Sequence, residues 1–153
     1  VVPGVSAAVA APAYAGIPVT HRGLAASYAV ISATLAGGAP ADLARTAAAA
    51  DTLVLLMAAE RLGGVCAQLI AAGRPADEPA AVVASASTGA QRVLTGTLAE
   101  LAAGDAEVDP PATLVTGPSV ALAGEYTGEV VVTGVARFLE AGEALASITQ
   151  AKN

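Results

Sequence analysis

The chain has 153 residues, with seven lysine or arginine residues against thirteen aspartate or glutamate residues, and its formal net charge is −6. This acidic balance argues against a general electrostatic grip on nucleic acid or on an anionic membrane surface. The length predicts a single domain. Because 55% of the residues are hydrophobic but only 3% are aromatic, we expect a core of small aliphatic side chains between closely packed layers.

The cysteine and the N-terminal region bear on the cellular location. Cys66 is the only cysteine, which excludes a disulfide framework and makes a reducing cytoplasm the expected location. Its apolar neighbours favour a buried, inert thiol over a nucleophile. The apolar first twenty residues have no basic leader and contain Pro3, Pro12 and Pro18, so we expect neither a signal peptide nor a membrane helix.

Helices and strands alternate along the chain. Ser6 is a candidate N-cap for a short helix over Ala7–Tyr14, and Leu24–Ile31 is compatible with a strand before the break at Leu35–Pro40. The further predicted elements are helices over Asp42–Ala50, Ala59–Ala72 (ended by Gly73) and Leu98–Ala103, strands over Leu53–Met57, Ala80–Ala84, Gln91–Thr97 and Ala112–Thr116, an edge strand over Gly128–Val132, and a terminal helix or tail over Val135–Ala151. The alternation predicts an α/β domain with a mixed, mostly parallel sheet flanked by helices and with a hairpin between residues 80 and 97.

Few residues offer catalytic chemistry. The sequence has one histidine, no paired cysteines and no phosphate-binding glycine loop, so we expect no metal site. His21 and Arg22 are the only adjoining titratable base and fixed cation, although a lone histidine in a loop is more often structural or merely exposed. Small residues follow several predicted strands, and such turns suit a nucleoside that is recognised through main-chain atoms.

Five segments carry a family resemblance. They are VVPGVSAAVAAPAYAGIPVTHRG at the start, then TLVLLMA, LIAAGRPADEPAAVV, STGAQRVLTGTL and PPATLV in order. Together they resemble the C-terminal half of the uroporphyrinogen-III C-methyltransferases, within the tetrapyrrole methylase family. The likeness covers residues 1 to about 120, so residues 1–124 are expected to form that domain, with residues 125–153 as an edge strand and a terminal helix or tail.

The resemblance implies an activity and a set of site residues. It implies transfer of methyl groups from S-adenosylmethionine to uroporphyrinogen III, which gives precorrin-2 on the branch towards sirohaem and cobalamin. The cofactor-binding residues that it implies are Ser6, Ala7, Met57, Ala86, Pro111 and Ala112. The candidate cations for the polyanionic tetrapyrrole are His21, Arg22 and Arg92.

The sequence also departs from the family pattern. The family's N-terminal domain, with its proton-handling groups, is absent, so we expect an excised domain, a truncated product or one piece of a split protein. Ser32-Ala33-Thr34 stands where the family has TGH, Leu56-Met57-Ala58 stands where it has YMG, and residues 116–120 (TGPSV) stand where it has VGEVV. These changes put full activity in doubt.

Two functional hypotheses follow from the resemblance. The first is a methyltransferase half that works only with a complementing N-terminal domain, and the second is a non-catalytic module for cofactor binding or dimerisation. The expected protein partner is a second copy of the chain, because members of the family are usually dimers, or a complementing N-terminal domain. A generic α/β binding domain with an accidental likeness is the third reading.

Overall fold

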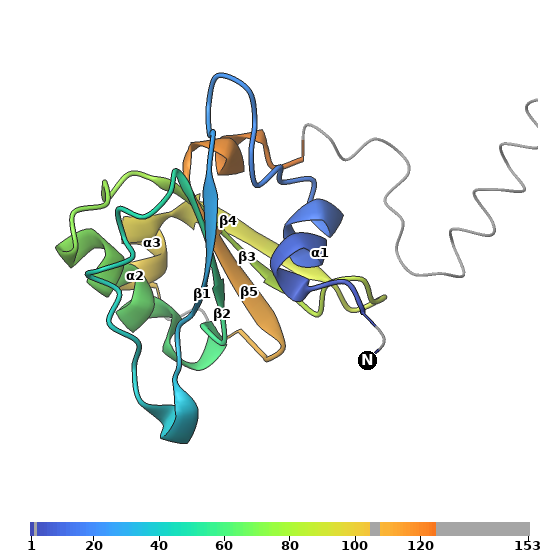
Figure 1. The fold of residues 1–153 in the computed structure, drawn as a ribbon, viewed down its shortest axis with the longest axis horizontal. Coiled ribbons are helices and arrows are strands. Elements are labelled where there is room, and N and C mark those ends of the chain that lie inside the picture. Colours follow the sequence, from blue (N-terminus) through green and yellow to red (C-terminus); the bar gives the residue numbers. More distant parts are fainter. Residues whose placement is uncertain (2, 105–107, 125–153) are drawn as a thin grey trace, which may run out of the picture.

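The computed structural model describes residues 1, 3–104 and 108–124, and in them a five-stranded sheet has helices on both faces (Figure 1). The helices are α1 (Ala7–Tyr14), α2 (Leu62–Ala71) and α3 (Leu98–Ala103), and the strands are β1 (Tyr28–Ser32), β2 (Thr52–Leu56), β3 (Pro79–Ala84), β4 (Arg92–Thr97) and β5 (Ala112–Thr116). Short 3-10 turns cover Ala36–Gly38, Ala59–Arg61 and Pro118–Leu122. The strand expected over Gly128–Val132 and the terminal helix or tail expected over Val135–Ala151 lie outside the described residues.

The strand order is β1-β2-β5-β3-β4, and it corrects one expectation about the sheet. Only β1 and β2 pair in parallel, whereas β5 is antiparallel to both of its neighbours and β3 is antiparallel to β4. The expectation of a mostly parallel sheet is therefore wrong. The crossover through α2 does connect two strands of the same direction, β2 and β3. However, β5 lies between them and is antiparallel to both, and a pattern of alternating elements cannot reveal this position.

Alternating side chains of the central strands point into two separate cores. Leu53, Leu55 and Leu114 pack with α2 and α3, while Val54 and Val115 pack with α1 on the opposite face. Four of the five β2 residues are buried, as expected for a continuous apolar run covered on both faces. Figure 1 shows α1 on one side of the sheet and α2 with α3 on the other.

Most predicted helix starts and ends are confirmed. Ser6 caps α1, since its hydroxyl oxygen accepts a hydrogen bond from the Ala8 N–H at 3.2 Å. Thr97 and Glu100 form a capping box at the start of α3. Gly73 ends α2 with φ +101°, a conformation that favours glycine. The predicted helix over 59–72 is divided, because a 3-10 turn precedes α2.

The helix predicted over Asp42–Ala50 is absent, and Arg74 provides the physical reason. This segment forms turns, and the Arg74 guanidinium donates hydrogen bonds to the carbonyls of Ala47, Ala50 and Asp51 at 2.8, 3.0 and 2.8 Å. The Asp51 N–H, which a helix would direct to the Ala47 carbonyl, donates instead to the Ser27 hydroxyl. Contacts with distant residues therefore override the helix propensity of the alanines.

Arg74 also forms a buried ion pair with Glu78. The side chains of both residues are only 9% exposed, and Nη2 of Arg74 lies 2.8 Å from Oε1 of Glu78. The same carboxylate oxygen accepts a hydrogen bond from the Thr116 hydroxyl at 2.6 Å. Arg74 and Glu78 thus join the segment before β2, the connection between α2 and β3, and the end of β5.

Asp51 connects the segment before β1 with the start of β2. Its Oδ2 atom accepts hydrogen bonds from the Ala26 N–H at 2.8 Å and from the Ser27 hydroxyl and N–H at 3.1 Å each. The hydrogen bond from the Ala26 N–H is the largest cause that holds the pKa of Asp51 below its ordinary value. The two bonds from Ser27 and the charge of Arg74 act in the same direction.

This lowered pKa predicts a specific acid sensitivity. Because the folded-state pKa of Asp51 lies below the unfolded value, the stabilisation is complete above about pH 4 and is lost as the pH falls through the folded pKa. We expect Asp51→Asn to lose less stability than the wild type between about pH 4 and pH 2. Urea unfolding followed by circular dichroism at a series of pH values measures this difference, and equal slopes for the two proteins would contradict it.

Cys66 lies in α2 and is fully buried, as the sequence suggested. Burial raises the pKa of its thiol to about 11, so the reactive thiolate is rare at neutral pH. None of the helices in the described part of the chain has the length and apolar character needed to cross a membrane.

Candidate functional site

A cavity of about 340 Å³ opens where several strands of the sheet begin or end. The start of α1, the end of β2, the turn after β3 and the start of β5 provide its walls. This volume lies within the range of roughly 300–1,000 Å³ that is usual for small-ligand pockets. We call it the strand-end pocket.

Five of the six residues predicted to bind the cofactor line this pocket. They are Ala7, Met57, Ala86, Pro111 and Ala112. The sixth residue, Ser6, directly precedes the pocket residue Ala7, and its hydroxyl is engaged in capping α1. Four separate parts of the sequence thus meet at one cavity, and the small side chains leave main-chain atoms accessible to a ligand.

Residues with a strained backbone conformation lie at or beside the pocket. Met57 follows β2 with φ +60°, and the residue is 68% exposed. Ser85 and Ser87, on either side of Ala86, have φ +48° and +67°. A positive φ is costly for residues other than glycine, and such strain persists where the surrounding structure fixes it, often at ligand-binding sites.

Hydrogen bonds from neighbouring elements fix this strained backbone. The Thr34 hydroxyl donates to the Met57 carbonyl at 3.1 Å, and the Ser85 N–H donates to the Pro111 carbonyl at 2.9 Å. Gln91 accepts from the Ser87 N–H and donates to the Tyr14 carbonyl at the end of α1, both at 3.0 Å. The turn between β3 and β4 is therefore tied to α1 and to the segment before β5, which fixes the walls of the pocket relative to one another.

The sequence analysis did not identify several residues of the pocket. These are Ala11, Thr34, Leu56, Ala59, Glu60, Val83, Pro110 and Thr113. Thr34 stands at the histidine of the family's TGH motif, so the resemblance contained a signal for it, whereas nothing in the pattern singled out Glu60. Glu60 is the one charged residue among the described residues that line the pocket.

The three candidate substrate cations do not share one cavity with the cofactor residues. His21 lines a shallow hollow beside α1 with Val9 and Ile17, and Arg22 is exposed in the turn that follows. Arg92 lines a separate hollow of about 790 Å³ on β3 and β4. Their role in substrate binding therefore remains a prediction.

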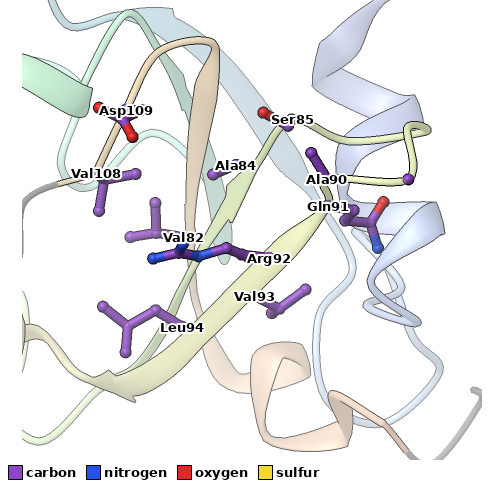
Figure 2. Close-up of a pocket in the computed structure, with 11 residues that line it drawn as sticks. Val82, Ala84, Ser85, Ala90, Gln91, Arg92, Val93, Leu94, Val108 and Asp109 are labelled. Carbon is purple, nitrogen blue, oxygen red and sulfur yellow. The ribbon is translucent and has the colours of Figure 1, made fainter.

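Figure 2 shows the hollow that contains Arg92. The Arg92 guanidinium extends from β4 across the sheet towards Val82, with Val108 and Asp109 on the far side of the hollow. Val82 belongs to the core of α2 and α3, whereas Val83, which lines the strand-end pocket, belongs to the core of α1. The two cavities therefore lie on opposite faces of the sheet.

Residues 116–120, which replace the family's VGEVV, contact the start of β2. Gly117 has φ +144°, and a Cβ atom there would lie 2.6 Å from the Asp51 carbonyl oxygen, so only glycine fits. Ser119 is buried, and its hydroxyl lies 3.2 Å from the Thr52 hydroxyl. Neither residue lines the strand-end pocket. In the described ranges, no three His, Cys, Asp or Glu side chains are grouped so that they could hold a metal ion.

The fold and this site define a mixed α/β domain with a pocket built from strand ends and small-residue turns. The sequence profile of the tetrapyrrole (corrin/porphyrin) methylases matches residues 1–102. The chain therefore belongs to the tetrapyrrole methylase family.

Two curated relatives show how much of a longer protein the chain represents. It is 48% identical over 100 residues to a siroheme synthase of Stutzerimonas stutzeri and 42% identical over 100 residues to a uroporphyrinogen-III C-methyltransferase of Bacillus subtilis. The matches cover 64% and 63% of this chain but 21% of each relative. The chain thus spans about a fifth of the length of these relatives.

Solved structures also show that the chain matches only part of a longer enzyme. A uroporphyrin-III C-methyltransferase of Thermus thermophilus, complexed with S-adenyl homocysteine, superposes with a TM-score of 0.72 at 39% identity, over 80% of this chain and 53% of that one. A cobalt precorrin-4 methyltransferase gives a TM-score of 0.68 at 25% identity, over 78% of this chain and 52% of that one. The chain therefore corresponds to about half of each of these enzymes.

Proposed function

We propose that residues 1–124 form the C-terminal domain of an S-adenosylmethionine-dependent enzyme that methylates uroporphyrinogen III to precorrin-2. The main support is that five residues implied by the resemblance, from four parts of the sequence, line one cavity. The named activity of the Bacillus subtilis relative and the S-adenyl homocysteine in the Thermus thermophilus structure support the reaction and the cofactor. The buried, reduced Cys66 is consistent with the proposed cytoplasmic location.

The strand-end pocket suits the adenosyl group of this cofactor. Its walls combine apolar side chains such as Leu56 and Val83 with the turns at Met57 and Ala86. Small side chains let a planar base approach the backbone, and main-chain groups can hydrogen-bond to it. When bound, S-adenosylmethionine supplies an electrophilic methyl group, and this domain would hold and orient it.

Turnover, in this proposal, needs an N-terminal domain of the family as the opposite wall. Methyl transfer requires the donor methyl and the acceptor carbon to be held in close alignment. This chain corresponds to about half of the solved enzymes, so it would supply one side of that arrangement. We assign no proton-transfer residue within it.

The test is methyl transfer from labelled S-adenosylmethionine to uroporphyrinogen III. We expect no turnover by the chain alone and measurable turnover when an N-terminal domain of the family is added. The N-terminal domain alone is the control. Turnover by this chain on its own, or none in the mixture despite cofactor binding, would contradict the proposal.

One set of observations favours a second candidate, a non-catalytic module that binds the cofactor or mediates dimerisation. The chain has Thr34 and Leu56 at the pocket, where the family has the histidine of TGH and the tyrosine of YMG. A module of this kind would bind S-adenosylhomocysteine yet fail to restore precorrin-2 synthesis in a deficient strain, even when fused to a functional N-terminal domain.

A further inference from the structure

We infer that Glu60 is a specificity-determining residue that distinguishes the cationic methyl donor from its product, an inference that rests on the proposed function. S-adenosylmethionine carries a positive sulfonium, whereas S-adenosylhomocysteine has a neutral thioether at the same atom. The remaining groups of the two molecules are identical. A single carboxylate at the pocket can therefore favour the donor electrostatically.

The position of Glu60 follows from the chain geometry after β2. Met57 follows β2 with a positive φ, and after Ala58 the chain forms the 3-10 turn Ala59–Arg61. This turn places Ala59 and Glu60, together with Met57, on the wall of the strand-end pocket. Glu60 is exposed, so a ligand in the pocket can reach its carboxylate without a rearrangement of the core.

No described cation neutralises this carboxylate. The ion pair found in the described part of the chain is that of Arg74 with Glu78. Arg61, the nearest arginine in sequence, has its Nη1 atom 3.4 Å from the Gly38 carbonyl oxygen. The negative charge of Glu60 is therefore available to a positively charged ligand.

The other charges and polar groups at the pocket point to the same ligand. Apart from Glu60, the described lining is uncharged, and Thr34 and Thr113 are its hydroxyl residues. A pocket with one negative charge and no positive charge favours a cation over a neutral molecule of the same shape. Loss of the methyl group removes that positive charge, so the same carboxylate would favour release of the product.

The experiment compares the affinities of the donor and the product by isothermal titration calorimetry. It uses the chain, alone and with an N-terminal domain of the family, as wild type and as Glu60→Gln. The measured quantity is the dissociation constant of S-adenosylhomocysteine divided by that of S-adenosylmethionine. We expect this ratio to fall about fivefold in Glu60→Gln at low salt, the factor for unit charges about 4 Å apart in water-like surroundings. The effect should shrink in high salt.

Asp77→Asn provides the matched control. Asp77 is an exposed carboxylate in the turn before β3 and does not line the pocket. Its substitution by asparagine removes the same net charge as Glu60→Gln. We expect this control to leave the ratio unchanged. Equal weakening of both ligands by Glu60→Gln would mean that Glu60 contacts a group common to both and would overturn the inference, as would no change in either. Failure of the wild type to bind either ligand, with or without the N-terminal domain, would refute the proposed function itself, and this inference with it.

Discussion

Replacing Arg74 with alanine is expected to lower the free energy of unfolding by about 3–5 kcal/mol, the range found when one partner of a buried ion pair is removed. The substitution leaves Glu78 buried without its counter-charge, and it removes the donors to the carbonyls of Ala47, Ala50 and Asp51. Urea denaturation monitored by circular dichroism measures the loss. A loss below about 1 kcal/mol would show that the buried pair has no such role.

Two further variants separate the contributions of charge and geometry at Arg74. Arg74→Lys keeps the positive charge but lacks the planar set of donors that reaches Glu78 and three carbonyls, so we expect an intermediate loss. Arg45→Ala removes an exposed arginine from the segment before β2, the segment whose carbonyls Arg74 binds. It should change stability by less than about 0.5 kcal/mol.

Substituting phenylalanine for Ala86 is expected to weaken binding of S-adenosylhomocysteine at least tenfold. Ala86 lies on the wall of the strand-end pocket, in a turn that is partly exposed to solvent. A larger side chain there would occupy the space proposed for the adenosyl group, and an unfavourable contribution of roughly 1.4 kcal/mol already gives a tenfold effect. Calorimetric titration of the wild type and the variant tests this expectation.

Ala90→Phe is the control for this experiment. Ala90 belongs to the same turn between β3 and β4, but it lines the hollow of Figure 2 and not the strand-end pocket. We expect its affinity for S-adenosylhomocysteine to match that of the wild type, with the same fold by circular dichroism. If Ala86→Phe remains folded and binds as tightly as the wild type, the pocket is not the binding site.

Local sequence patterns predicted the elements of the fold better than their arrangement. The N-cap at Ser6, the apolar run of β2 and the glycine after α2 depend on neighbouring residues, so the sequence shows them directly. The absence of a helix over Asp42–Ala50 depends on Arg74, more than twenty residues away, and no local pattern reveals this contact. The position of β5 between β2 and β3 is likewise a property of the whole sheet.

For the candidate site too, the sequence predicted some residues and could not predict those whose position depends on the folded chain. Motif resemblance selected five residues that share a cavity, and three of them, Ala7, Met57 and Ala86, lie in the range that the family profile matches. It could not reveal Val83, which reaches the pocket only through the pairing of β3 with β5, or Glu60, whose position depends on the turn after Met57. It also selected Arg92, which the structure places on the opposite face of the sheet.

The location of β5 has a consequence for how the chain acquires its structure. The β1–β2 pair and the β3–β4 hairpin contact each other through β5, the last strand in sequence among the described residues. During synthesis the two halves of the sheet can form early, but their strands can pair into one hydrogen-bonded sheet only after residues 112–116 have left the ribosome. A product that ended at residue 102, where the family match ends, would lack β5, so β2 and β3 would each expose an unpaired edge and the product would be prone to aggregate.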